Sequence, residues 1–271
     1  MPDTAPAIAV QDFVHTLYQV KNHICRITLN RPDRRNALNP RAYAEIEAAF
    51  RHAHQDLDVR CVIVTGADPS FCSGEDVKEM MTGEARPADA APRIARPTPA
   101  AMAVIECDKP VIAAVNGPAV GWGMELALYA DIRIASEKAV FAELFIKRGL
   151  VCDVGGFWKL PAIVGNAKAA ELLFTGEPIN AKEALRIGLV REITNHADVV
   201  RAAEHLAGFI AQNPPLALVA MKQGLRMATP GDPHEIGAWA IEQIYRLFRT
   251  EDHREGVKSF LEKRAPVFVG R

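Results

Sequence analysis

The sequence has 271 residues, of which 49% are hydrophobic and 24% charged, and its formal net charge at pH 7 is −1. This length and composition are typical of a globular chain with a large buried core and argue against a disordered or fibrous protein. A net charge near zero removes the general electrostatic signature of nucleic-acid binding. The apolar runs are far shorter than the roughly 20 residues of a membrane span, so neither nucleic acid nor membrane is a predicted partner.

The five cysteines are odd in number and form no Cys-x-x-Cys pair, which argues against a disulfide framework or a zinc site. Residues 1–14 contain no basic side chain, so they do not resemble a secretory signal, and we expect them to be frayed. The expected location is therefore the cytoplasm. No metal site is predicted.

Strands and helices alternate in the pattern that begins near Tyr18. Residues 18–29 are rich in β-branched and apolar side chains and predict a hairpin. Asn39-Pro40 is an N-cap followed by a first-turn proline, which predicts a helix as far as about His54. Short, continuously apolar runs are typical of parallel strands buried on both faces, and they occur at 61–65, 111–115 and 132–135. Each is followed by a turn and a helical stretch, which indicates an α/β fold.

Helical patterns dominate the second half of the chain. They cover residues 167–174, 181–187, 197–212, 216–227, 236–248 and 253–263. We therefore expect an α/β core over residues 1–195 and a helical C-terminal region over 196–271, whose apolar stripe builds an oligomer. The proline-rich stretch 82–99 is expected to form a surface loop.

Two of the predicted strands lead into glycine-centred turns, at Gly74 and Gly121. Glycine can adopt positive φ and lets a ligand approach the backbone closely. The following residues, Glu75 and Trp122, would present N–H groups at helix N-termini, where the helix dipole favours an anion. Two such donors directed at one oxygen form an oxyanion hole, in which each is worth about 2.7–4 kcal/mol of transition-state stabilisation. The alternative is a pair of tight turns that bind no ligand.

Together, these segments resemble the crotonase (enoyl-CoA hydratase/isomerase) superfamily. The resembling blocks occur in family order over nearly the whole chain from about Tyr18, at 29–38, 70–80, 109–131, 149–156, 173–176, 181–190 and 260–264. The resemblance implies a crotonase-like spiral core of ββα repeats with a C-terminal helical trimerisation region. It also implies a homotrimer or a dimer of trimers.

The resemblance further implies an acyl-CoA substrate, with coenzyme A bound as part of the substrate and no permanently bound cofactor. The thioester oxygen would lie in the hole formed by the Glu75 and Trp122 amides. By position in the matched blocks, the coenzyme A contacts fall on Arg34, Ala37, Ser73, Glu75, Asp76 and Val77. Phe260 and Lys263 match tail residues that contact the coenzyme and close its site, and a neighbouring subunit can supply them. For Lys263 the alternative is a solvated helix face.

Two positions distinguish the reactions of the family. Hydratases of the family use two glutamates: the first matches Glu125, but Phe145 occupies the place of the second, and a phenyl ring cannot transfer a proton. Glu143 lies two residues earlier. The block 149–156 resembles the signature of family isomerases, whose aspartate moves a proton next to the thioester, and that residue matches Asp153. The alternative for Asp153 is a helix cap.

The resemblance therefore implies an enzyme, an enoyl-CoA hydratase/isomerase. Double-bond isomerisation by Asp153 is favoured over hydration, because one carboxylate can remove a proton as a base and return it elsewhere as an acid. Two alternatives stay open: a crotonase-fold hydrolase of acyl-CoA or C–C bonds, and a non-catalytic acyl-CoA binding protein. Nothing in the sequence identifies the acyl group.

Overall fold

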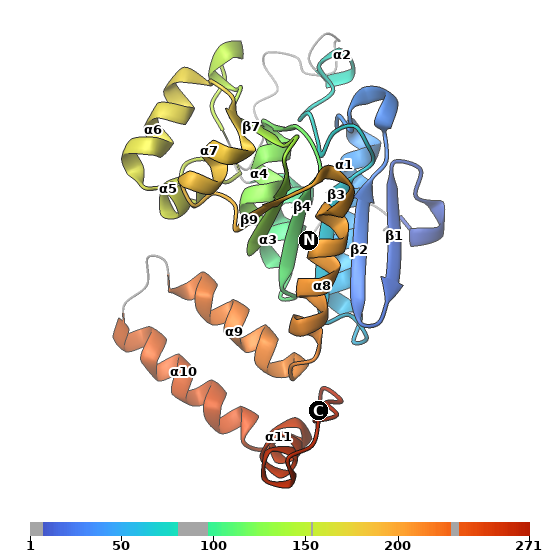
Figure 1. The fold of residues 1–271 in the computed structure, drawn as a ribbon, viewed down its shortest axis with the longest axis vertical. Helices are drawn as coiled ribbons and strands as arrows, with labels where there is room; N and C mark the ends of the chain where they lie inside the picture. The colour runs from blue at the N-terminus through green and yellow to red at the C-terminus, as the bar shows by residue number, and fades with distance from the viewer. Residues whose placement is uncertain (1–7, 81–96, 153, 229–232) are drawn as a thin grey trace, which may run out of the picture.

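A computed structural model describes residues 8–80, 97–152, 154–228 and 233–271 (Figure 1). Within these residues, six strands form one sheet in the order β1-β2-β3-β4-β6-β9, and three form a smaller sheet in the order β5-β7-β8. In the larger sheet β1 and β2 pair antiparallel, and all other neighbours are parallel. The strands are β1 (Thr16–Lys21), β2 (Ile24–Leu29), β3 (Cys61–Gly66), β4 (Val111–Val115), β5 (Ala119–Val120), β6 (Ile132–Ser136), β7 (Val140–Ala142), β8 (Ile179–Asn180) and β9 (Glu192–Thr194).

The helices fall into a group around the sheets and a C-terminal group. The first group consists of α1 (Pro40–Gln55), α2 (Val77–Met80), α3 (Pro99–Glu106), α4 (Trp122–Tyr129), α5 (Lys159–Val164), α6 (Asn166–Thr175), α7 (Ala181–Arg186) and α8 (Val199–Ala211). The second consists of α9 (Pro215–Met227), α10 (Pro233–Leu247) and α11 (Glu251–Glu262). Short 3-10 helices occupy Val10–Asp12, Pro32–Arg34, Ile146–Arg148 and His196–Asp198.

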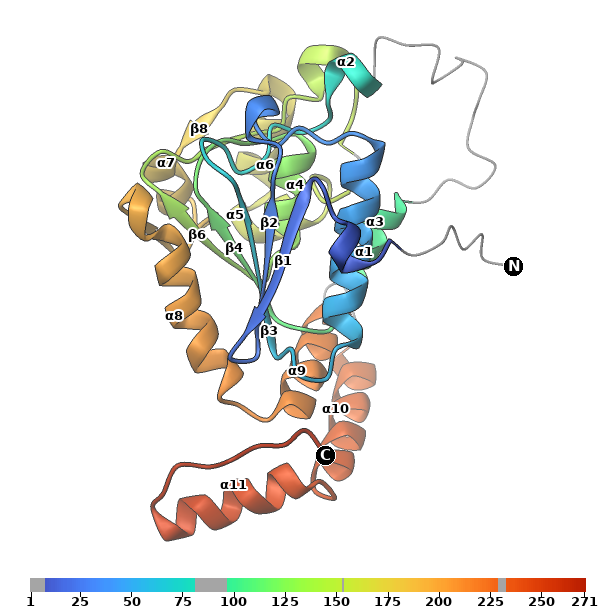
Figure 2. The same cartoon turned by 90° about the vertical axis from the view of Figure 1, so that its right-hand side faces the viewer.

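Helices cover both faces of the larger sheet (Figure 2). On one face α1 buries residues at helical spacing, among them Ile46, Ala49 and Phe50, in the same cluster as Val62 and Val64 of β3. Every residue of β3 and β4 is buried. This two-sided burial is the reason that these strands are continuously apolar in the sequence.

The other face of the sheet is covered by α8 (Figure 2). Its buried residues Val199, Ala203 and Ala207 pack against a cluster that includes Ile63 and Ile112. Alanine at these positions lets the helix backbone approach the sheet closely. Although α8 lies beyond residue 195, where the C-terminal region was expected to begin, it packs as part of the core.

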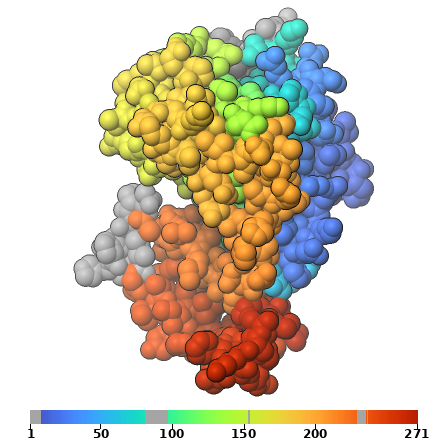
Figure 3. Space-filling view, in the orientation of Figure 1, coloured from blue at the N-terminus to red at the C-terminus, as the bar shows by residue number. Residues whose placement is uncertain are grey.

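The helices α9 to α11 extend below the sheets (Figures 1 and 3). Polar contacts hold α9 to the core: Lys222 Nζ lies 2.9 Å from Asp131 Oδ2 and donates to the Lys109 carbonyl at 2.7 Å. Arg226 donates to the Ile105 carbonyl at 2.8 Å and pairs with Asp108. In contrast, α10 leaves Ile241, Ile244 and Tyr245 exposed, and Phe248 just after it is exposed too.

Most elements predicted from local pattern are confirmed, but the helical stretch expected after residues 132–135 is wrong, because β6 leads through a turn into β7. The hairpin, the three buried strands and the helix after Asn39 all form, and the Asn39 side chain accepts a 2.9 Å bond from the Ala42 N–H as the predicted N-cap. The stretch 82–99 lies mostly outside the described residues. Within the described parts of the chain, no helix combines the length and apolar character needed to span a bilayer.

Candidate active site

The two glycine turns lie side by side. Cys72 and Ala119 form a parallel bridge, and the Val120 N–H donates to the Cys72 carbonyl at 2.9 Å. Gly74 and Gly121 adopt φ angles of +86° and +53°, in the region that favours glycine. A Cβ on Gly74 would lie 3.5 Å from the Trp122 nitrogen, so the first turn reaches the N-terminus of α4.

The backbone directs both proposed donors. The Leu38 N–H donates to the Gly74 carbonyl at 2.8 Å. Because a trans peptide places its C=O and N–H on opposite sides, the Glu75 N–H points away from Leu38. Trp122 is the first residue of α4, with Gly121 as its N-cap, and no group within the described residues accepts a hydrogen bond from its backbone N–H. The structure thus places Glu75 and Trp122 on adjacent turns, and their role as paired oxyanion donors stays a prediction.

The indole of Trp122 packs against α1. It is buried, and its ring centroid lies 5.1 Å from that of Tyr43 in an edge-on arrangement. The Tyr43 hydroxyl in turn lies 3.5 Å from Glu75 Oε1. Tyr43 of α1 therefore contacts residues of both turns, Trp122 through its ring and Glu75 through its hydroxyl.

Phe145 lies against the second turn. A Cβ built on Gly121 would be 3.8 Å from Cζ of the Phe145 ring, which is ordinary van der Waals contact. Where family hydratases have their second glutamate, this chain therefore places an apolar ring beside the N-cap of α4. Glu143 is buried.

Glu125 is fully buried in the first turns of α4. Its Oε1 accepts hydrogen bonds from the backbone N–H groups of Val154, Gly155 and Gly156, at 3.1, 2.8 and 3.0 Å. Asp153, the proton carrier expected from the resemblance, lies outside the described residues. The turn that follows it directly is therefore bound to α4.

Most of the predicted coenzyme A positions lie on two adjacent segments. The Ser73 N–H donates to the Arg35 carbonyl at 3.1 Å, and the Asp76 N–H donates to the Leu38 carbonyl at 2.8 Å. This pairing aligns residues 34–38 with residues 73–76. The predicted positions on these segments and next to them are Arg34, Ala37, Ser73, Glu75, Asp76 and Val77, of which Arg34 and Val77 are exposed.

Two predicted residues lie far from this group in the same chain. Phe260 is in α11, and Lys263 ends that helix with a left-handed φ of 54°. Figures 1 and 2 place α11 at the opposite end of the molecule from α2 and the turns. One chain therefore does not bring Phe260 and Lys263 to the hole.

Several polar residues that sequence reasoning missed hold the turns. Arg31 pairs with Asp76 at 3.2 Å and donates to the Ala37 carbonyl at 2.6 Å, so it links the two predicted coenzyme A segments. Asn36, buried and with φ +55°, donates to the carbonyls of Ala67 and Ser70, both at 2.7 Å. Their partners are distant in sequence, so no local pattern indicates these bonds.

A second polar group fixes the ends of β3 and β4. His196 Nε2 lies 3.1 Å from Asp68 Oδ1, and its Nδ1 lies 3.0 Å from the Asn116 carbonyl oxygen. The Asn116 side chain donates to Asp68 Oδ1 at 3.0 Å. This bond from Asn116, together with those from His196, lowers the pKa of Asp68.

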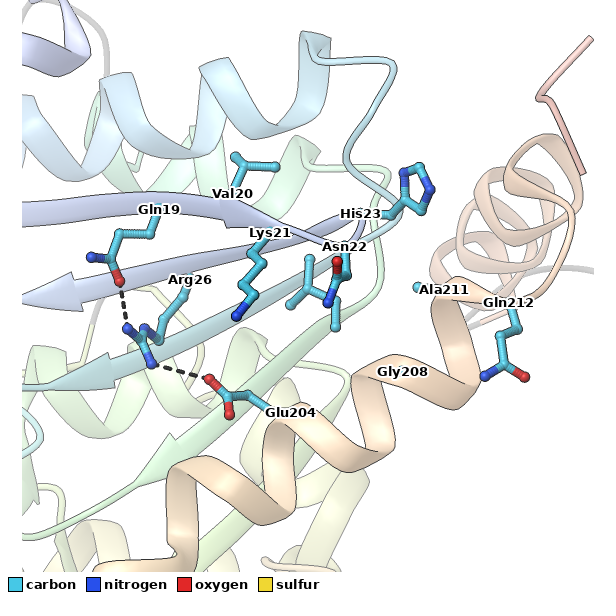
Figure 4. Close-up of a pocket in the computed structure, with 11 residues that line it drawn as sticks. Gln19, Val20, Lys21, Asn22, His23, Arg26, Glu204, Gly208, Ala211 and Gln212 are labelled. Atoms are coloured by element: carbon cyan, nitrogen blue, oxygen red, sulfur yellow. Dashed lines mark hydrogen bonds and ion pairs between the residues drawn. The ribbon is translucent and has the colours of Figure 1, made fainter.

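A groove of about 860 Å³ lies elsewhere, between the β1–β2 hairpin and α8 (Figure 4). Within it Arg26 donates to Gln19 at 2.5 Å and to Glu204 at 3.0 Å. None of the residues that line it belongs to the glycine turns. The groove is therefore separate from the candidate active site.

Comparison with known proteins agrees with this geometry. The family model described as enoyl-CoA hydratase/isomerase matches residues 19–271. The chain belongs to the enoyl-CoA hydratase/isomerase, or crotonase, superfamily. It is therefore an enzyme of the lyase or isomerase class that acts on coenzyme A thioesters.

The relatives differ in the reaction that their names describe. The chain is 34% identical over 259 residues to the 1,2-epoxyphenylacetyl-CoA isomerase of Escherichia coli, which covers 94% of this chain and 98% of that one. It is 37% identical over 254 residues to the (E)-benzylidenesuccinyl-CoA hydratase of Thauera aromatica, with 93% and 98% covered. Among solved structures, a putative enoyl-CoA hydratase from Streptomyces coelicolor matches over 100% of both chains, with a TM-score of 0.87 and 32% identity. Relatives named as an isomerase and as a hydratase thus both match this chain over nearly its whole length.

Proposed function

We propose that this enzyme moves the double bond of an enoyl-CoA thioester, with Asp153 as the proton carrier. The thioester oxygen would accept hydrogen bonds from the Glu75 and Trp122 amides. In a 3-enoyl thioester, Asp153 would remove a proton from C2, and the electron pair of that C–H bond would become part of a dienolate. Asp153 would then return the proton to C4, which leaves the double bond between C2 and C3. Isomerisation is complete without any co-reactant.

The proposed hole explains how such a proton becomes acidic enough to remove. Negative charge develops on the thioester oxygen as the enolate forms, and N–H donors fixed in advance stabilise that charge without reorganising. The two turns hold these donors through backbone hydrogen bonds rather than through mobile side chains. The N-terminus of α4 adds its dipole.

The observation that carries the choice of isomerisation is the contact between Phe145 and Gly121. Hydration by the two-glutamate mechanism needs a second carboxylate to hold the water. A phenyl ring at this position offers no carboxylate to hold or activate a water molecule. Isomerisation needs only one carboxylate, which takes up the proton and returns it, so it fits these residues better than hydration by two glutamates.

We also propose that the coenzyme lies along the paired segments 34–38 and 73–77 and that a second subunit completes its site. Phe260 is 82% exposed and belongs to α11, which lies far from the turns of its own chain. In a homotrimer or a dimer of trimers, the tail of a neighbouring copy would supply Phe260 and Lys263. A lysine suits the phosphates of coenzyme A because it adds a positive charge.

The test is to incubate the full chain with 2-enoyl-CoA and 3-enoyl-CoA thioesters in ¹⁸O-labelled water. Mass spectrometry, the absorbance of the conjugated thioester and the free-thiol concentration would be followed together. We expect interconversion of the two thioesters with no ¹⁸O gained. Incorporation of ¹⁸O into the acyl chain would indicate hydration, release of free coenzyme A would indicate hydrolysis, and binding without turnover would indicate a binding protein. Each of these would refute isomerisation.

A variant pair assigns the proton carrier. Asp153→Asn keeps the size of the side chain but removes its basicity, so we expect kcat to fall by about 10²–10⁴-fold. Asp58→Asn, at an exposed aspartate beside His23, is the matched control and should keep parental kcat. Parental turnover in Asp153→Asn would disprove the role of Asp153.

A further inference from the structure

Helix α4 contacts two parts of the active site at once. Its first residue, Trp122, provides a proposed oxyanion donor, and two later residues, Glu125 and Tyr129, contact the turn 154–156. Residues four apart lie on the same face of a helix. All eight residues of α4 are buried, so the helix is held on every side.

Glu125 holds the N–H groups of this turn. Three consecutive amides, from Val154 to Gly156, converge on the single oxygen Oε1 within 3.1 Å. Hydrogen bonds from three N–H donors to one oxygen fix the orientation of a carboxylate. Glu125 is thereby suited to anchoring the turn, because a proton taken up by Oε1 would compete with the three N–H donors for the same lone pairs.

Tyr129 holds the carbonyl side of the same turn. Its hydroxyl donates to the Val154 carbonyl oxygen. Burial raises the pKa of the phenol, so the hydroxyl keeps its proton and stays a donor. The ring is flanked by Trp158, with centroids 6.4 Å apart, and by Lys159 Nζ, 5.6 Å from its centroid.

The two glycines of the turn are packed against their surroundings. A Cβ on Gly155 would lie 3.1 Å from Cε2 of Tyr129. A Cβ on Gly156 would lie 2.6 Å from Sγ of Cys152. Gly155 thus lets the turn pack closely against Tyr129 of α4, and Gly156 leaves room for the neighbouring Cys152 side chain.

We propose that Glu125 and Tyr129 are positioning residues, which fix the turn after Asp153 at a set distance from the oxyanion hole, and that Glu125 does not carry the proton. This inference rests on the proposed function of Asp153. One helix then carries the proposed Trp122 donor and also holds the turn 154–156. Such spacing matters because a displacement of about 1 Å in an active site can cost about 10²-fold in rate.

Two variants of Glu125, to glutamine and to alanine, distinguish a residue that positions the turn from one that carries the proton. Glu125→Gln retains an oxygen that can accept the three N–H bonds but cannot act as a base. We expect it to keep kcat within roughly tenfold of the parent, since neutral hydrogen bonds replace charge-assisted ones. Glu125→Ala removes the acceptor, and kcat should fall by about 10²-fold with little change in KM. If Glu125 carried the proton, both variants would be equally inactive.

Tyr129→Phe tests the hydrogen bond from the Tyr129 hydroxyl to the Val154 carbonyl, and its expected effect is smaller. The variant keeps the ring and loses one hydrogen bond, so kcat should fall roughly tenfold. Tyr18→Phe is the matched control because burial also raises the pKa of the Tyr18 phenol, but Tyr18 lies in β1. Its kcat should be parental.

Two further readouts separate positioning from general loss of structure. The pH profile of kcat should keep the same limbs in Glu125→Gln, and amide hydrogen exchange at 154–156 should accelerate in Glu125→Ala much more than in Glu125→Gln. Loss of a limb in Glu125→Gln, or exchange unchanged in Glu125→Ala, would overturn the positioning role. Failure of the parent to move a double bond would instead refute the proposed function, so the two failures are distinguishable.

Discussion

The core and the C-terminal helices bury their apolar side chains to very different extents. In the core, Ile63 and Ile112 are fully buried between the sheet and α8. In and just after α10, Ile241, Ile244, Tyr245 and Phe248 are 54%, 45%, 63% and 53% exposed. Contiguous exposed apolar side chains usually mark an interaction surface.

This difference in burial matches a difference between the two parts of the proposed active site, the oxyanion hole and the coenzyme A site. Bonds within the core hold the turns of the proposed oxyanion hole, whereas the tail residues expected at the coenzyme lie in and at the end of α11, far from those turns. On this proposal one chain completes its own hole, and a neighbouring subunit completes the coenzyme A site. The following variants test each side of the comparison.

The largest effect is expected inside the core, from Gly123→Ala. The added Cβ would lie 2.2 Å from the Cys72 carbonyl oxygen, a backbone atom of the first glycine turn. The turns must therefore separate, which should lower the free energy of unfolding by about 1–3 kcal/mol. It should also lower kcat by about 10²–10³-fold, as the loss of an oxyanion donor does.

Gly208→Ala in α8 is the control for this change. A Cβ there would meet nothing within 4 Å, so the variant should be as stable as the parent or gain about 0.5–1 kcal/mol. Thermal unfolding and steady-state kinetics measure both variants. Parental kcat in a folded Gly123→Ala would show that the close approach of the turns is not needed for catalysis.

An intermediate effect is expected on the C-terminal side, from Ile241→Glu combined with Ile244→Glu. Two carboxylates in an apolar subunit interface cannot be desolvated without a large cost, so the assembly should dissociate. Light scattering should detect a monomer in place of the trimer or hexamer that we propose for the parent. KM should rise, because Phe260 and Lys263 of a neighbour would be lost, while the circular dichroism of the core persists.

Leu57→Glu makes the same kind of change at an isolated leucine that is 90% exposed, and it should leave the assembly intact. A monomeric parent at micromolar concentration, or an undissociated double variant, would contradict the expected subunit interface.

The smallest effect concerns Asp68, which fixes the ends of β3 and β4. Because its pKa is lowered in the folded chain, first by the bond from Asn116, its contribution to stability is present above the unfolded pKa and is lost as pH falls through the folded pKa. The side chain is 66% exposed, so the contribution is at most about 1 kcal/mol. Lowering the pH from 7 to 3 should therefore reduce Tm slightly more in the parent than in Asp68→Asn. Equal losses of Tm would rule out this contribution.

Local patterns predicted most of the fold and the backbone of the hole. Alternation, apolar runs and the Asn39 cap are short-range signals, and Gly74 and Gly121 mark turns that only glycine adopts easily. The side-chain contacts that fix the site were not predicted. The bond between Tyr129 and Val154 joins residues 25 apart, and the one between His196 and Asn116 joins residues 80 apart. Such pairings depend on how the elements pack, and no periodicity in the sequence encodes them.

The strand β4 has a consequence for communication within the enzyme. At its start, the Val111 N–H donates at 2.7 Å to Asp131 Oδ2, the same oxygen that receives Lys222 of α9. At its other end, Asn116 leads into the turn of Gly121. The five residues of β4 therefore connect the anchor of α9 to the segment that leads into the Gly121 turn. If the C-terminal helices form the proposed subunit interface, β4 would couple the packing of that interface to the proposed oxyanion hole.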